Sequence, residues 1–235
     1  MFRLLAAIFV GSALLLAGAL AFQAGRVLFR IRWTVRLWVK RRRGVVLFYC
    51  GWFGLYACFI LFATGPRASD PYPPAQGSPY KLPWQRGVRR FVAQGNRSFV
   101  SHRGSHLYAY DFWMPMGTVV LAARGGTVAR VEVNHDGLGA LSNYVKVDHP
   151  DGTSAMYAHV RKDGALVKHG ESVRQGQALA YSGMVGQTLY PHLHFVVVGP
   201  NEAPVPVAFS DVPNGIPLAG HSYISGNSAQ EVLNP

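Results

Sequence analysis

The hydrophobic pattern divides the chain into two parts. Two uncharged apolar runs, 4–22 and 45–64, fill most of the first quarter. Each has about the 20 residues that cross a bilayer as a helix. Beyond residue 85 the apolar residues instead come in short β-rich runs separated by glycines. The pattern therefore predicts an α-helical transmembrane hairpin followed by a β-rich domain.

The second part predicts strands rather than helices. Residues 126–133 alternate between polar and apolar, and the runs 143–148 and 153–159 flank an Asp151-Gly152 pair that favours a hairpin turn. No segment sustains a helical period. We expect an all-β domain, a β-sandwich or open barrel of about six to nine strands, with a short strand in the tail. The remaining strand runs are 117–123, 172–181 and 193–198.

Charge supports this division. The 235-residue chain carries a net charge of +12, but residues 1–64 hold nine basic and no acidic residues, whereas residues 65–235 hold fourteen basic and eleven acidic ones. We therefore do not expect a nucleic-acid partner. Eight of the basic residues lie between the two apolar runs, in a loop spanning 26–44. Because basic loops stay in the cytoplasm, the pattern predicts a membrane protein in which both ends of the hairpin, and the domain that follows it, lie outside the cytoplasm.

The first apolar run has an alternative interpretation as a signal peptide cleaved near Ala21 or Ala24, although only Arg3 precedes its apolar segment. Either way the chain after residue 64 is exported. Residues 65–85 contain six of the fifteen prolines, so we expect an extended linker there. The expected organisation is a hairpin over 1–64, the linker over 65–85, a domain over 86–200 and an extension over 201–235 packed on it.

The candidate chemistry begins with His192-Leu193-His194. Residues two apart on a strand point to the same face, so both imidazoles should lie together. Such a pair suits a divalent metal and its bound water. The alternative is a polar strand end with two solvated histidines. His135, His149, His169 and His221 lie beside turn-forming residues, and we expect them at the surface.

Several motifs together resemble the lysostaphin-type (LytM-like) zinc endopeptidases, over about residues 86–200. The first half of the resemblance rests on Ser101-His102-Arg103-Gly104, Asp111-Phe112 and Gly117-Thr118-Val119. The second half rests on Tyr157-Ala158-His159, Gly170-Glu171-Ser172-Val173 and Pro191-His192-Leu193-His194-Phe195. The motifs occur in the family's order and are specific as a set.

The resemblance implies a membrane-anchored enzyme that hydrolyses peptide bonds in peptidoglycan with one Zn²⁺. Together with the predicted hairpin it implies a bacterial inner-membrane protein whose C-terminal domain lies in the periplasm. It implies that His102, Asp111 and His194 bind the metal and leave a position for water. It also implies that His159 and His192 act on protons in the same cleft. The cleaved bond, the oligomeric state, and gating by a regulatory protein or by the tail stay open.

The sequence departs from the family at the first ligand. In the usual His-x-Gly-x-Asp pattern the histidine and the aspartate are four positions apart, whereas His102 and Asp111 are nine apart. His106, five residues before Asp111, is the rival ligand, although on a strand this odd offset would place it on the opposite face. Two other functions remain as alternatives, a non-catalytic peptidoglycan-binding or activator module of the same fold and a lipoyl-like adaptor.

Overall fold

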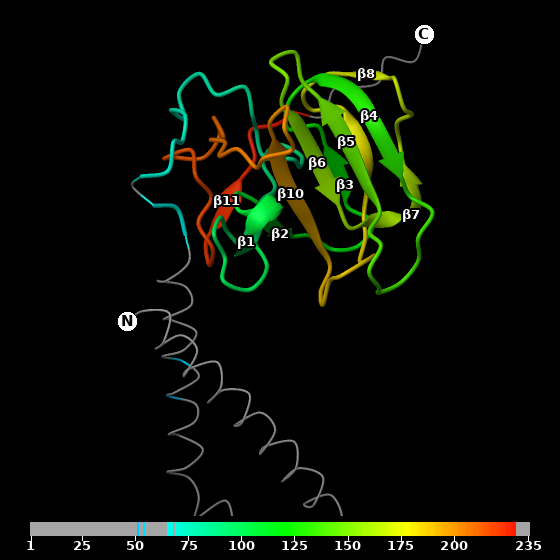
Figure 1. Ribbon diagram of the computed structural model, residues 1–235, viewed down its shortest axis with the longest axis horizontal. Coiled ribbons are helices and arrows are strands. Elements are labelled where there is room, and N and C mark those ends of the chain that lie inside the picture. Colours follow the sequence, from blue (N-terminus) through cyan, green and yellow to red (C-terminus); the bar gives the residue numbers. More distant parts are fainter. Residues whose placement is uncertain (1–50, 52–53, 55–64, 68, 229–235) are drawn as a thin grey trace, which may run out of the picture. The chain divides into compact units, whose positions relative to one another are not determined.

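The computed structural model describes residues 51, 54, 65–67 and 69–228 (Figure 1). The predicted hairpin, 1–64, lies outside these residues except for Gly51 and Gly54 and stays a prediction. Within the described part, none of the helices combines the length and apolarity of a membrane span. The chain divides into two units, Met1–Ala57 and Cys58–Pro235, and the strands found among the described residues all belong to the second.

The second unit is built from strands, which confirms the all-β class. The described residues contain eleven strands, more than the sequence predicted, and a single 3₁₀ turn, η1 (Gly104–His106). The strands are β1 (Arg89–Gln94), β2 (Tyr110–Trp113), β3 (Val119–Leu121), β4 (Gly126–Glu132), β5 (Tyr144–Asp148), β6 (Ser154–Ala158), β7 (Val160–Ala165), β8 (Ser172–Val173), β9 (Ala178–Ser182), β10 (His192–Val198) and β11 (Ser222–Ile224).

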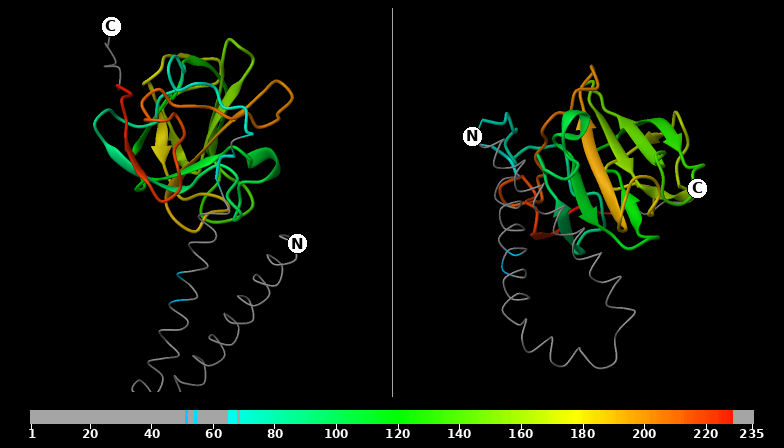
Figure 2. Two further views of the ribbon diagram at one scale, coloured as in Figure 1. Left: turned by 90° about the vertical axis from the view of Figure 1, so that its left-hand side faces the viewer. Right: turned by 60° about the horizontal axis from the view of Figure 1, so that its bottom comes forward.

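The strands form two antiparallel sheets (Figures 1 and 2). The larger sheet has the order β11-β1-β2-β10-β6-β5-β4-β8, and the smaller has the order β3-β9-β7. The long strand β10 therefore lies inside the larger sheet, between β2 and β6. Segments far apart in the chain meet there, which is the usual way in which an all-β fold assembles a site.

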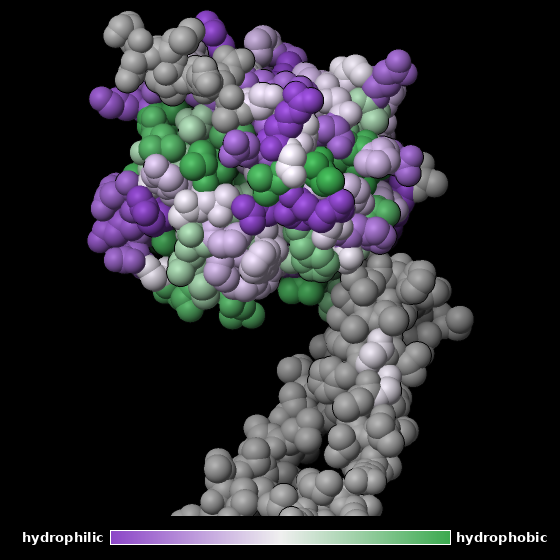
Figure 3. Space-filling model, turned by 180° about the vertical axis from the view of Figure 1, so that it is seen from behind, coloured by the Kyte–Doolittle hydropathy of each residue, from purple (hydrophilic) through white to green (hydrophobic). Residues whose placement is uncertain are grey.

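One hydrophobic core receives side chains from both sheets, as in a sandwich. Phe112 of β2 and Leu193 of β10 are registered neighbours in this core, and Leu179 and Ala180 join it from the smaller sheet. Because side chains alternate along a strand, the residues that flank Phe112 on β2 and Leu193 on β10 face away from the core. The outer surface seen from behind mixes hydrophilic and hydrophobic residues (Figure 3).

The strands that the sequence pattern did not predict have weak alternation. In β7 three consecutive exposed residues, Arg161, Lys162 and Asp163, separate the buried positions. Asp163 also has a positive φ of 51°, which interrupts the regular strand. The run 172–181 is divided into β8 and β9, because Gly176 forms a turn between them.

The end of the predicted linker belongs to the core. Tyr80, Leu82 and Trp84 are buried, and Tyr80 forms a parallel bridge with Phe209 of the C-terminal extension. The linker prediction over 65–85 therefore needs correction at this end, because these three apolar residues belong to the hydrophobic core despite the neighbouring prolines. In the described part of the extension, β11 is paired to β1.

His149 is buried rather than exposed, which corrects the expectation from its turn. Its Nδ1–H donates to the Gly125 carbonyl at 2.9 Å, and its ring packs edge-on against Tyr80 with 5.5 Å between centroids. Burial lowers the pKa of His149 below its ordinary 6.5. The folded chain therefore keeps this imidazole neutral at pH values where the unfolded chain protonates it.

We expect the stability of the protein to fall as the pH is lowered from 7 to 5, partly because of His149. The unfolded state takes up a proton that the folded state lacks at this position, so acidification favours unfolding. His149→Gln can keep a donor toward Gly125 and should reduce this loss. Urea unfolding at both pH values measures it, with His169→Gln, at an exposed histidine, as the control. An equal loss in all three proteins would contradict the prediction.

Candidate metal centre

The site lies on the face of the larger sheet opposite the core, where four strands are in register. Asp111 of β2 is paired with His194 of β10 on one side and with Gln94 of β1 on the other. On the next strand, β6, Ala158 is the partner of His194. This row of registered positions brings together residues from four separate stretches of sequence.

The Asp111 carboxylate is the centre of this row and is buried. Its Oδ1 lies 3.1 Å from His102 Nε2, 2.8 Å from His194 Nδ1 and 3.5 Å from His192 Nε2. Burial opposes ionisation, but the hydrogen-bonding contacts and charges of His102 and His194 outweigh it and hold the pKa of Asp111 well below its usual range. The carboxylate is therefore ionised at neutral pH.

The hydrogen bonds of His102 test whether this donor set fits a metal. Its Nδ1 lies 2.7 Å from the Gly95 carbonyl oxygen, which can only accept, so Nδ1 carries the hydrogen. In the neutral ring Nε2 is then a lone-pair atom, and it faces another acceptor, Asp111 Oδ1. Two buried acceptors at 3.1 Å need a cation between them, a proton or a metal ion.

The spacing of the donor atoms also suits zinc. Ligand atoms of His102, Asp111 and His194 all lie within 4.8 Å of one another. Ligands at the usual ~2.0–2.1 Å from a tetrahedral zinc ion lie about 3.3 Å apart. Two nitrogens and one carboxylate oxygen are a common donor set for catalytic zinc. The residues present therefore fit the metal that the sequence predicted.

His106, the rival ligand, occupies a different position. It ends the 3₁₀ turn η1, so the argument from strand faces does not apply to it. Its Nδ1 lies 3.0 Å from Nε2 of His194, the ring nitrogen that does not face Asp111. The described residues give two candidate metal groups, and His106 is in neither. His102 is therefore the candidate first ligand.

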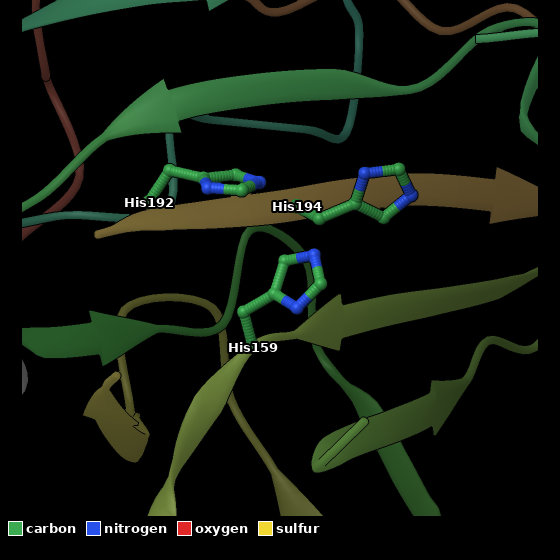
Figure 4. A group of neighbouring side chains, drawn as sticks. All are labelled: His159, His192 and His194. Atoms are coloured by element: carbon green, nitrogen blue, oxygen red, sulfur yellow. The ribbon is translucent and has the colours of Figure 1, made fainter. Parts of the chain in front are cut away.

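His159 and His192 lie beside this centre (Figure 4). His192 and His194 project from the same side of β10, and His159 lies where β6 meets β7, with its ring toward that of His194. The ring centroids of His159 and His192 are 4.6 Å apart. Together with His194 these histidines form the second group of candidate metal ligands.

Both histidines are held by the same kind of contact, a carbonyl together with a hydroxyl. His159 Nδ1 lies 2.8 Å from the Val185 carbonyl and 3.1 Å from Ser142 Oγ, which itself donates to that carbonyl.

For His192 the corresponding distances are 2.9 Å to the Tyr190 carbonyl and 3.1 Å to Thr188 Oγ1, which also donates to its carbonyl. In each ring the carbonyl fixes the hydrogen on Nδ1 and leaves Nε2 as the free base.

The backbone around His159 is constrained. His159 has a φ of 63°, a left-handed conformation that is uncommon for residues other than glycine. The loop that supplies its carbonyl contains Gly186, with a φ of 98°, and a Cβ there would lie 2.8 Å from Ser142 Cβ. Only glycine allows this approach of the two loops that hold His159. Strained positions of this kind cluster at functional sites.

Burial also sets the charge of these groups. It lowers the pKa of His159 to about 4 and lowers that of His192, so both rings are neutral at pH 7. Burial and then the charge of Asp111 raise the pKa of Tyr190 to about 12, so its phenol stays protonated. The site therefore offers two neutral bases and one phenol donor near an ionised carboxylate.

The structure brings together all five residues that the sequence predicted: His102, Asp111, His159, His192 and His194. Sequence reasoning missed the residues that hold them, which are Gln94, Ser142, Thr188 and Tyr190. Each is an ordinary polar residue in a loop or at a strand end. Only the strand register or the loop contacts reveal its position.

Part of the chain is similar in sequence to known peptidases. Residues 105–206 match the model of peptidase family M23. A metalloprotease of uncharacterised function from Haemophilus influenzae is 38% identical over 85 residues, which cover 36% of this chain and 17% of the relative. The peptidoglycan DD-endopeptidase ShyB of Vibrio cholerae is 35% identical over 126 residues, 54% of this chain and 27% of the relative.

Among solved structures, the catalytic domain of the antimicrobial peptidase lysostaphin from Staphylococcus simulans has 25% sequence identity and a TM-score of 0.37. The matched region covers 48% of this chain and 80% of the lysostaphin domain. The sequence relatives are matched over less than a third of their own lengths. The family match begins after His102 and includes His106, so the choice of the first ligand depends on the geometry.

We predict that His102→Ala abolishes stoichiometric zinc binding, whereas His106→Ala retains one zinc ion per chain. The reason is that, of these two histidines, His102 presents a free Nε2 toward Asp111, whereas the Nδ1 of His106 faces His194. Metal analysis of both purified proteins after dialysis measures the difference. Loss of zinc in His106→Ala with retention in His102→Ala would identify His106 as the ligand instead.

Proposed function

We propose that this chain, whose residues 105–206 match the model of peptidase family M23, is a zinc-dependent endopeptidase that hydrolyses peptide bonds in peptidoglycan. The observation that carries the proposal is the convergence of His102, Asp111 and His194 beside two further neutral histidines. Peptidoglycan is the substrate class named for the Vibrio relative. Metallopeptidases of this family use zinc, which fits the donor set described above.

In the proposal His102 Nε2, Asp111 Oδ1 and His194 Nδ1 hold the metal. Zinc supplies Lewis-acid chemistry, because it polarises a water molecule and the peptide carbonyl and makes both more reactive at neutral pH. A three-residue donor set is what a hydrolytic zinc site requires. The burial of these three side chains limits competing contacts with bulk water.

His159 and His192 are proposed to move the protons. Their Nδ1 hydrogens are committed to carbonyl groups, so only Nε2 of either ring is available to accept the proton of the attacking water. The resulting imidazolium keeps its Nδ1–H bond to the carbonyl, which stabilises the positive charge. Its Nε2–H can then be transferred to the leaving amine.

Tyr190 completes the chemistry on this face. Its ring packs on His192, with 4.5 Å between centroids, and its phenol stays protonated at neutral pH. A phenol donor in this position can stabilise the oxyanion that develops on the peptide carbonyl. The proposal thus assigns proton transfer to two neighbouring histidines and oxyanion stabilisation to the adjacent tyrosine.

We also propose that the domain works at the outer face of a bacterial inner membrane. The support is the sequence pattern of two apolar runs around a basic loop, which would leave both chain ends outside the cytoplasm. The core begins by Tyr80, so few residues separate the second apolar run from the domain. This placement would keep the enzyme near newly assembled cell wall.

The enzymatic proposal predicts chelator-sensitive release of peptide fragments from purified sacculi by the detergent-solubilised chain. His194→Ala should lose both zinc and activity, because it removes a ligand. His192→Ala should keep zinc and lose at least about a hundredfold in rate, as is typical when general acid–base catalysis is removed. Mass spectrometry of the released fragments and metal analysis measure both effects.

The control for these variants is His169→Ala, at an exposed histidine outside the site, which should behave as the wild type. Sacculus binding without fragment release, by a wild-type chain that holds zinc, would instead support the non-catalytic binding or activator module.

The membrane proposal predicts opposite signals from two C-terminal reporters expressed in bacteria. Alkaline phosphatase, which folds only outside the cytoplasm, should be active in the membrane fraction, whereas green fluorescent protein exported by the same chain should stay dark. Replacing the basic residues of loop 26–44 with neutral ones should weaken the preference for an external C-terminal reporter, because those residues retain the loop in the cytoplasm. Fluorescent fusions with inactive phosphatase would contradict the topology.

A further inference from the structure

We infer that Gln94 is a positioning residue that fixes the orientation of the Asp111 carboxylate and thereby sets the affinity of the metal site. The inference rests on the zinc site of the proposed function. It concerns a residue on a different strand that contacts the carboxylate from the side away from the histidines.

Gln94 contacts the Asp111 carboxylate directly. Gln94 ends β1 and is registered with Asp111 on β2, and its Nε2 donates to Asp111 Oδ2 at 2.6 Å. The histidine contacts are all to the other oxygen, Oδ1. The two carboxylate oxygens therefore have separate partners. Gln94 holds Oδ2, and Oδ1 remains directed toward His102 and His194.

The orientation of the Gln94 side-chain amide is fixed by its neighbours. A glutamine side chain has a donor end and an acceptor end, and only the donor end can satisfy a carboxylate. Gln94 Oε1 accepts hydrogen bonds from Ser98 Oγ at 2.7 Å and from Ser101 Oγ at 3.2 Å. These two hydroxyls hold the acceptor end, so the NH₂ group is directed at Asp111.

The same contacts connect Gln94 to the loop of the first ligand, His102. Ser98 and Ser101 lie in the loop that also carries His102, and the Ser98 carbonyl accepts a hydrogen bond from the His102 backbone N–H at 3.1 Å. Gln94 thus contacts the Asp111 ligand directly and the His102 loop through the two serines. A hydrogen bond to a charged acceptor is stronger than one between neutral groups.

The consequence is a carboxylate that is oriented before the metal arrives. Without the Gln94 donor, Asp111 could rotate and present either oxygen or both, and binding zinc would have to fix this rotation. Loss of such outer partners typically lowers metal affinity by about 10- to 100-fold. Activity would fall in parallel, because fewer chains would hold zinc.

The test is the zinc affinity of Gln94→Met, which keeps the length of the side chain but cannot donate. Competition with a chromophoric chelator gives the dissociation constant for Zn²⁺, and thermal unfolding of the metal-free protein reports any structural damage. We expect about 10- to 100-fold weaker zinc binding. We also expect zinc to raise the unfolding midpoint less than it does in the wild type. The matched control is Gln85→Met, at an exposed glutamine, which should bind zinc normally.

A Ser98→Ala, Ser101→Ala double variant separates the two parts of the contact. It removes the loop bonds and keeps the donor to Asp111, so its zinc affinity should fall by less than that of Gln94→Met. Equal losses would show that Gln94 acts only through the loop, and this would overturn the inference. Unchanged affinity in Gln94→Met would also overturn it. Absence of zinc from the wild type would instead refute the proposed function.

Discussion

The candidate metal centre depends on one carboxylate oxygen that has several histidine nitrogens close to it. Asp111 Oδ1 lies within hydrogen-bond distance of His102 Nε2 and His194 Nδ1, in a position closed to solvent. The Gly95 carbonyl forces the lone pair of His102 toward that oxygen. A buried cluster of acceptors is stable only when a cation is shared among them. The metal proposal follows from this requirement, and the positions of the surrounding histidines give it a chemical use.

The same strand register builds both the site and the core. Val92, Phe112 and Leu193 are registered neighbours on the core face of β1, β2 and β10. The next row, on the opposite face, contains Gln94, Asp111 and His194, and a register irregularity in β1 between Val92 and Gln94 brings Gln94 opposite Asp111. A slip of one residue in any of these strands would exchange the faces and expose apolar side chains, so hydrophobic burial fixes the register. The precise placement of the ligands is therefore a by-product of core packing.

Part of this arrangement could be predicted from the sequence. The pair His192 and His194 follows from the two-residue period of strands, and the glycine-separated runs indicate an all-β domain. The sequence could not choose between His102 and His106, because the choice depends on how the η1 segment folds over β10. Gln94 could not be recognised at all, since a glutamine at the end of a half-exposed strand has no distinguishing pattern. The burial of His149 and Tyr80 likewise depends on contacts between distant segments.

The central claim is that one ion is shared by His102, Asp111 and His194, with His159 and His192 left free as bases. Crystals of the zinc-loaded protein, measured with X-rays on both sides of the zinc absorption edge, would locate the ion directly. The account predicts one anomalous peak among His102 Nε2, Asp111 Oδ1 and His194 Nδ1. A peak held by His159, His192 and His194 without Asp111, or the absence of any peak on this face of the sheet, would contradict it.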